Sequence, residues 1–179
     1  SIEAPKPQGI FYGLQTLGQI LRFREQKQQK LTLPSLELCD WPDFRLRGYM
    51  IDTGRNFVPL DQLKEDARIL SHYKMNTFHW HLTENEAWRI ESKKYPQLNS
   101  AEFHKKTRDP GQFYTYDQIR EFIQFCNERH IRVIPEIDMP GHSKCFKRAM
   151  GTAMNRRKGR KYLKEILAEF FEEIPQNLC

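Results

Sequence analysis

The stretch IRVIPEIDMPGH, residues 131–142, begins as an apolar run and ends in two acids, two prolines, a glycine and a histidine. A short apolar run bounded by turn residues is typical of a buried strand. The preceding segment has helical periodicity, and Thr115 stands where an N-cap is expected. Its apolar face consists of Ile119, Phe122, Ile123 and Cys126. The stretch therefore predicts a strand entered directly from a helix, with ionisable groups at its carboxyl end.

The same order of strand, polar loop and amphipathic helix occurs elsewhere in the chain. Residues 45–52 and 75–83 are strand candidates, the second rich in aromatic and β-branched residues. A helix is expected after Pro59, with Leu63, Ala67 and Leu70 on one face, and another after Gly159. Alternation of this kind predicts a parallel sheet covered by helices, either doubly wound or closed as a barrel.

The N-terminal part follows a different pattern. Residues 9–23 predict a helix after a glycine turn, and a polar connection follows at residues 26–30. We interpret residues 1–40 as the end of a small N-terminal α+β domain with its linker. Residues 41–179 are then the first part of a barrel domain.

Composition bounds the class of protein. The chain has 179 residues, 39% of them hydrophobic and 12% aromatic, which fits one globular domain with a sizeable core. It contains no run of about 20 apolar residues, so no membrane contact is expected. The net charge is +6, but the most basic run, residues 156–164, forms the polar side of a helix without a nucleic-acid-binding motif. We therefore expect no nucleic-acid partner.

The four cysteines lack the spacing of a zinc site or a redox motif. They are interpreted as free thiols: Cys39, Cys126, Cys145 and Cys179.

Chemistry in a parallel α/β fold gathers at the carboxyl ends of the strands, because the loops there vary while the strands hold position. Each predicted strand ends in ionisable side chains. The first strand contributes Asp52 and Arg55, the second His79, His81, Glu84 and Glu86, and the third Glu136, Asp138 and His142. Three such ends converging at one edge of a sheet indicate a functional site.

Period-two alternation places Glu136 and Asp138 on one face of the third strand. Two carboxylates in a dry interior repel, so at least one of them needs a cation or a hydrogen-bond donor nearby. His142 is the local candidate, and Arg47, Arg55 and Arg89 are candidates from neighbouring segments.

A metal site is not the expectation for this region. His79 is interpreted as a hydrogen-bonded core residue. A zinc site shared by His79 and His81 is an alternative, but the sequence places no further ligands for it. We expect neither a metal nor a cofactor.

Several segments together are diagnostic. They are RGYMIDTGR (47–55), NTFHWHLTENEAWRIE (76–91), YPQL (95–98), FYTYDQIREF (113–122) and IRVIPEIDMPGH (131–142). In this order they resemble the β-N-acetylhexosaminidases of glycoside hydrolase family 20. FYGLQTLGQIL (11–21) also resembles the segment that joins the family's small N-terminal domain to its catalytic barrel.

The resemblance implies a (β/α)8 barrel that removes terminal N-acetylglucosamine or N-acetylgalactosamine from glycans. Family members hydrolyse with retention of configuration, using the 2-acetamido oxygen of the substrate as the nucleophile. An adjacent Asp–Glu pair holds the acetamido group and protonates the leaving oxygen. Such enzymes need no cofactor, and they are often exported or lysosomal.

Four residues are assigned to substrate binding or support through the resemblance. Arg47 resembles the arginine that binds sugar hydroxyls, for which a guanidinium fork is well suited. Asp138 and His142 match the family's third-strand segment, in which the histidine supports the acid and lines the pocket. Glu84 stands where the family usually has Asp, so its carboxylate extends one methylene further.

The family's Asp–Glu pair lies in a later motif, His-x-Gly-x-Asp-Glu, after a helix that resembles residues 162–175. This sequence ends at Cys179 without that motif. We therefore expect roughly the first three βα units of the barrel, with no hydrolysis by this chain alone. Its partners would be the rest of the barrel or a second copy at the open sheet edge. The alternative is a non-catalytic glycan-binding or assembly module derived from the same fold.

Overall fold

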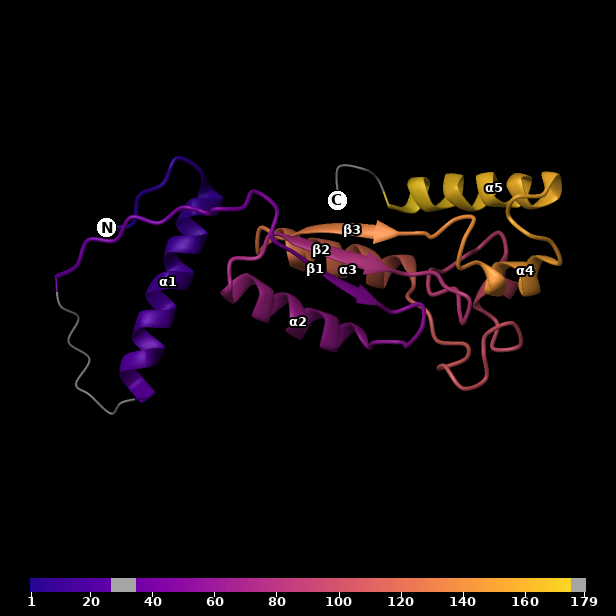
Figure 1. The fold of residues 1–179 in the computed structure, drawn as a ribbon, viewed down its shortest axis with the longest axis horizontal. Coiled ribbons are helices and arrows are strands. Elements are labelled where there is room, and N and C mark those ends of the chain that lie inside the picture. The colour runs from indigo at the N-terminus through magenta and orange to yellow at the C-terminus, as the bar shows by residue number, and fades with distance from the viewer. Residues whose placement is uncertain (27–34, 175–179) are drawn as a thin grey trace.

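The computed structural model describes residues 1–26 and 35–174 (Figure 1). Two parts of the sequence-based predictions therefore lie outside the described residues: most of the linker at residues 26–30, and Cys179. The elements in chain order are α1 (Pro7–Gln26), β1 (Gly48–Asp52), α2 (Leu60–His72), β2 (Thr77–His81), the 3₁₀ turn η1 (Pro96–Asn99), α3 (Tyr116–Asn127), β3 (Arg132–Glu136), α4 (Lys144–Met150) and α5 (Arg157–Glu173). None of the described helices is both long and apolar enough to cross a membrane.

The three strands form one parallel sheet in the order β1-β2-β3, as the alternation predicted. Gly48 pairs with Thr77 and Asp52 with His81, and Thr77 and His81 in turn pair with Arg132 and Glu136. β1 begins three residues later than the sequence pattern indicated, and β2 and β3 are shorter at both ends. The register aligns the carboxyl ends of all three strands.

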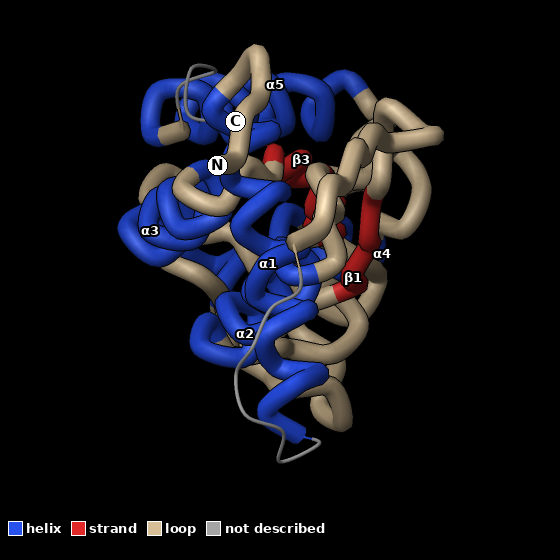
Figure 2. Tube along the Cα trace, turned by 90° about the vertical axis from the view of Figure 1, so that its left-hand side faces the viewer, coloured by secondary structure: helices blue, strands red, loops and turns tan. Residues whose placement is uncertain are grey.

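One face of the sheet is packed against helices. Figure 2 shows α2 and α3 together on the same side of the strands. Phe78, Trp80 and Val133 point into this layer and are fully buried. The Trp80 ring meets the rings of Tyr114 and Phe122 edge to face, with centroids 4.7 and 4.9 Å apart. The predicted apolar positions of α2 and α3 complete this core, in which Leu63, Ala67, Ile119, Phe122, Ile123 and Cys126 are buried and Leu70 is partly buried.

The other face of the sheet is largely open. Met50 of β1 is 49% exposed and Ile134 of β3 is 38% exposed. The sheet has three strands within the described residues, so the outer edges of β1 and β3 carry no strand neighbour there. Parallel sheets are normally covered on both faces, which makes this open face a place where further structure fits.

The start of α3 follows from local sequence. The Thr115 side chain accepts a hydrogen bond from the Gln118 amide, and the Gln118 side chain accepts one from the Thr115 amide at 2.9 Å. This reciprocal arrangement is a capping box, which satisfies two amides at the helix start. It confirms the predicted N-cap.

The last helix differs from its prediction. It begins at Arg157, so Gly159 lies inside α5 rather than before it. A Cβ atom at Gly159 would lie 2.0 Å from the carbonyl oxygen of Ala153. Glycine is therefore required by the close approach of the preceding loop, not by a helix boundary. The short helix α4 was not predicted at all, and it ends at Gly151 in the left-handed region, with φ of 65°.

Helix α1 was predicted, and it lies beside the amino ends of the strands (Figure 1). It contacts the α/β layer through polar side chains. Gln19 donates to the His72 carbonyl at 2.7 Å, and the Lys74 ammonium donates to the Thr16 hydroxyl at 2.6 Å. This end of the molecule is opposite to the end that carries the acidic side chains.

Candidate functional site

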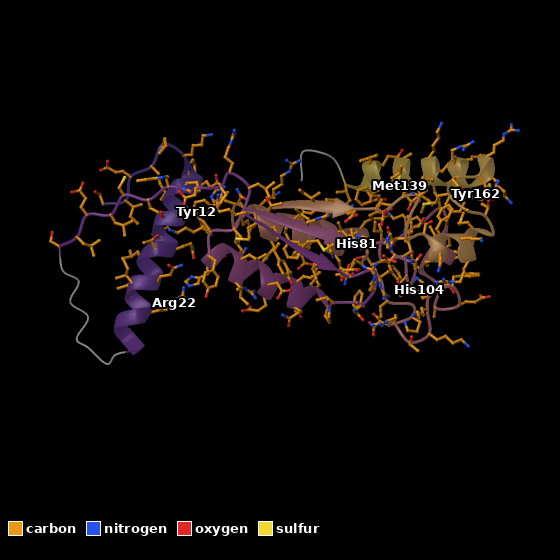
Figure 3. All side chains as sticks on the ribbon, in the orientation of Figure 1. Tyr12, Arg22, His81, His104, Met139 and Tyr162 are labelled. Atoms are coloured by element: carbon orange, nitrogen blue, oxygen red, sulfur yellow. The ribbon has the colours of Figure 1, made fainter. Side chains whose placement is uncertain are left out.

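The ionisable side chains predicted at the strand ends do meet at one edge of the sheet. Asp52, His81 and Glu136 occupy one row of the register. Figure 3 shows His81 at the carboxyl end of the strands, where the loops toward α4 begin. The edge carries two adjoining groups of side chains, one around Glu84 and one around Glu136.

The first group centres on Glu84, whose side chain is fully buried. Arg55 forms ion pairs with Asp52 and with Glu84, and His142 Nδ1 contacts the same Glu84 carboxylate. The Arg55 guanidinium also lies 3.3 Å from His142 Nδ1. The hydrogen bond with Asp52, with the nearby acids, raises the pKa of Arg55. A cation is thus held beside a buried carboxylate and a histidine.

Gly54 allows this group to assemble. A Cβ atom there would lie 2.8 Å from Glu84 Cβ and 3.1 Å from the Thr83 carbonyl carbon. Any larger residue would push the loop after β1 away from the loop after β2. Arg55 reaches Glu84 because its neighbour has no side chain.

The second group consists of His79, His81, Glu136 and Asp138. Glu136 Oε2 lies 2.6 Å from His79 Nε2 and 2.9 Å from His81 Nδ1. Burial alone would raise the pKa of Glu136, but the contacts with the two histidines outweigh it and the pKa is lowered. The Asp138 amide donates to the Thr83 hydroxyl at 3.0 Å, which fixes the backbone beyond β3.

Arg89 supports the edge from behind. It is fully buried, and its guanidinium donates to four carbonyls, those of Thr53, Arg108, Asp109 and Gln112. Burial lowers the pKa of Arg89 despite nearby acidic groups. It was a candidate partner for the strand-end acids, but the structure uses it to join the loop at residues 108–112 to the loop after β1.

The structure does not bring Arg47 to this edge. Arg47 precedes β1, so it lies at the opposite end of the strands from Glu84 and His142. Its guanidinium donates to the carbonyls of Lys74 and Phe44 at 2.8 and 2.7 Å, and it lies over the Tyr12 ring. These contacts occupy the fork that the resemblance assigned to sugar hydroxyls.

Of the four residues assigned from sequence, Glu84 and His142 are in contact and Asp138 follows the neighbouring strand end. Arg55, which the sequence offered as a candidate partner of the strand-end acids, also lies at this edge. A signal for it was present, because Arg55 follows its strand whereas Arg47 precedes it. Carboxyl ends of parallel strands share one edge, so strand direction alone favoured Arg55.

The chain matches the family model "Glycosyl hydrolase family 20, catalytic domain" over residues 44–177. A β-hexosaminidase from Porphyromonas gingivalis is 42% identical over 150 residues, covering 80% of this chain and 19% of the relative. One from Vibrio furnissii is 40% identical over 161 residues, covering 83% of this chain and 26% of the relative. The chain thus spans about a fifth to a quarter of these relatives.

Two solved structures agree over nearly the whole chain. A β-N-acetylhexosaminidase from Bacteroides fragilis aligns with a TM-score of 0.81 at 32% identity, over 97% of this chain and 38% of the other. An exo-β-N-acetylglucosaminidase from Vibrio harveyi, solved with N-acetylglucosamine, aligns with a TM-score of 0.82 at 31% identity, over 97% and 32%. With three parallel strands that match part of its catalytic domain, this chain belongs to glycosyl hydrolase family 20, the β-hexosaminidases.

Proposed function

We propose that this chain forms part of the active site of a β-N-acetylhexosaminidase, with the strand-end edge as one wall of the sugar pocket. The observation that carries the proposal is the contact of Arg55, buried Glu84 and His142 at the carboxyl ends of β1, β2 and β3. A similar protein from Vibrio harveyi was solved with N-acetylglucosamine, which supports the substrate class. The reaction would be removal of terminal N-acetylglucosamine or N-acetylgalactosamine with retention of configuration.

Each side chain of this wall has a chemical role in the proposal. Arg55 pairs with Asp52 and with Glu84, so it holds the buried carboxylate in place beside His142 in the wall of the pocket. Glu84 orients His142, and Asp138 supports the acetamido end of the sugar. Protonation of the leaving oxygen belongs to an Asp–Glu pair, and these 179 residues contain no Asp–Glu dipeptide.

The fold proposal extends the observed sheet. We assign β1, β2 and β3 with their helices to roughly the first three units of a (β/α)8 barrel, with residues 41–179 as its first part. Residues 1–40 are assigned to the end of a preceding domain and its linker. The family match beginning at residue 44 and the open face of the sheet support this division.

The first test is turnover by the chain alone on an aryl N-acetylglucosaminide. We expect no release of the chromophore, because the proton donor is missing. Release that follows this protein through purification would overturn the assignment of catalysis to residues beyond this chain.

The second test is sugar binding, followed by amide chemical shifts on titration with N-acetylglucosamine. We expect shifts at Arg55, Glu84 and His142, and at least a tenfold weaker affinity in Arg55→Met. The matched variant Arg47→Met removes the same charge from the other end of β1 and should bind as the wild type does. Equal losses in both variants would refute the placement of the pocket.

A further inference from the structure

A second cluster at the same edge has the composition of a metal site. His81 ends β2, Glu136 ends β3 and Asp138 lies two residues further on. One nitrogen of His81 and one oxygen from each carboxylate all lie within 4.8 Å of one another. Imidazole and carboxylate together are ligands typical of zinc and neighbouring transition metals.

The burial of His81 supplies an independent observation. His81 is 5% exposed, and neither of its ring nitrogens has a hydrogen-bond partner within the described part of the chain. Its Nδ1 lies 2.9 Å from Glu136 Oε2 without the alignment of a hydrogen bond. Ligands about 2.0–2.1 Å from one zinc ion in a tetrahedral arrangement are roughly 3.3 Å apart. The two atoms are therefore placed much as two ligands of one ion are.

The charge of the cluster favours a cation. Glu136 and Asp138 bring two negative charges to this space, and among the side chains that the structure describes no lysine or arginine forms an ion pair with either. Arg55, a candidate from the sequence, is engaged with Asp52 and Glu84. Two partly buried carboxylates in one space repel each other, and a divalent ion would offset both charges.

His79 adds a feature found around bound metals. Its Nε2 lies 2.6 Å from Oε2 of Glu136, the oxygen that also approaches His81. Carboxylate ligands are commonly held by such hydrogen bonds, which fix the direction of the coordinating oxygen. His79 would thus orient Glu136 rather than bind the ion itself.

We propose that His81, Glu136 and Asp138 bind one divalent transition-metal ion, zinc in the first instance, with the fourth position open to water. The ion would tie the end of β2 to the end of β3. The sequence-based expectation was that no metal binds, because a site on His79 and His81 lacked further ligands. In the fold, the segment of β3 and the residues after it supply these further ligands, Glu136 and Asp138. The inference shares Asp138 with the proposed sugar pocket, but its evidence is the grouping of the three side chains and not the pocket.

The test is titration of the chelator-treated chain with zinc chloride, followed by calorimetry and by the thermal unfolding midpoint. We expect one ion per chain and a higher midpoint with zinc, because a ligand bound by the folded state alone stabilises it. Asp138→Asn should weaken binding more than about tenfold, since its carboxylate is a ligand. His79→Gln should weaken it about 10- to 100-fold, the usual cost of removing a group that orients a ligand.

His72→Gln is the matched control, since it removes a histidine outside the cluster and should leave affinity and stoichiometry unchanged. Calcium and magnesium chloride should not replace zinc, because both prefer all-oxygen ligands. Substitution with cobalt should give visible absorption of a four- or five-coordinate ion that disappears in Asp138→Asn. The proposal is overturned if the wild type binds no zinc, or if Asp138→Asn and His81→Gln bind it as the wild type does.

Discussion

One face of the β1–β2–β3 sheet lies against α2 and α3, whereas the other carries half-exposed side chains. On the covered face Phe78, Trp80 and Val133 are fully buried and surrounded by aromatic rings. On the other face, residues of the same strands alternate with them and remain accessible, Met50 and Ile134 among them. The covered face therefore supplies the stability of this chain, while the open face and its carboxyl edge hold the polar groups available for chemistry.

Trp80→Ala on the covered face is expected to have the largest effect on stability. The indole is fully buried against Tyr114 and Phe122, and its Nε1 donates to the Thr53 hydroxyl at 3.1 Å. We expect a loss of about 3–5 kcal/mol in the free energy of unfolding, measured with urea. Met50→Ala on the open face is the paired variant. A loss in Met50→Ala as large as in Trp80→Ala would contradict the division of roles.

The second prediction concerns Arg89, which joins two loops at the carboxyl edge of the sheet. Arg89→Met leaves four carbonyls without their donor in a buried setting. An unsatisfied buried group costs about 1–3 kcal/mol, and partial hydration of the loop should keep the total near about 3 kcal/mol. Urea unfolding of the wild type and of Arg89→Met measures this loss in the free energy of unfolding. Arg68→Met, which breaks an exposed pair with Glu65, should cost less than about 1 kcal/mol.

A third prediction uses pH. His104 is buried, with Nε2 near the Leu98 carbonyl at 2.8 Å and Nδ1 accepting from the Gly111 amide at 3.0 Å. Burial lowers its pKa below the usual 6.5. The folded state therefore binds fewer protons than the unfolded state, and stability should fall as the pH drops from 6.5 toward the folded pKa.

The measurement is urea unfolding at several pH values in that window. His104→Gln has no proton to take up, so its stability should change less across the window than that of the wild type. The same slope in both proteins would show that His104 is not the group responsible.

The smallest expected effect lies on the open face. Ile134→Thr should change the free energy of unfolding by about 0.5 kcal/mol or less, because Ile134 is already 38% exposed. Its neighbour on the covered face, Val133→Thr, buries a hydroxyl and should cost about 1–3 kcal/mol. Urea unfolding of the two variants compares the loss of stability on the two faces of the sheet at consecutive residues of β3.

Local patterns predicted most of the fold. The helix of Tyr116–Asn127 and its cap could be predicted because Thr115, Gln118 and the apolar face lie within a few turns of one another. Helix α4 could not, since its seven residues are too few to establish a period. Gly159 was misplaced because the atom that demands it, the Ala153 carbonyl oxygen, lies in a loop whose path no sequence pattern describes.

The site was predicted in part. The sequence indicated which side chains end the strands, and Glu84 and His142 do meet. The strand-end pattern grouped Arg55 with Glu84 and His142, whereas the resemblance by segment assigned Arg47, which flanks the same strand at its other end. The grouping of His81, Glu136 and Asp138 depends on the pairing of β2 with β3, a non-local contact.

Gly159 also limits how this chain can be engineered. Replacing a glycine inside a helix with alanine is a common way to stabilise a protein, with a usual gain of about 0.5–1 kcal/mol. In α5 the added methyl group would meet the Ala153 carbonyl oxygen at 2.0 Å and the Met154 Cα at 3.1 Å, both backbone atoms. Alanine is therefore expected to destabilise the protein at this one position, and a library of variants chosen by helix propensity should leave Gly159 unchanged.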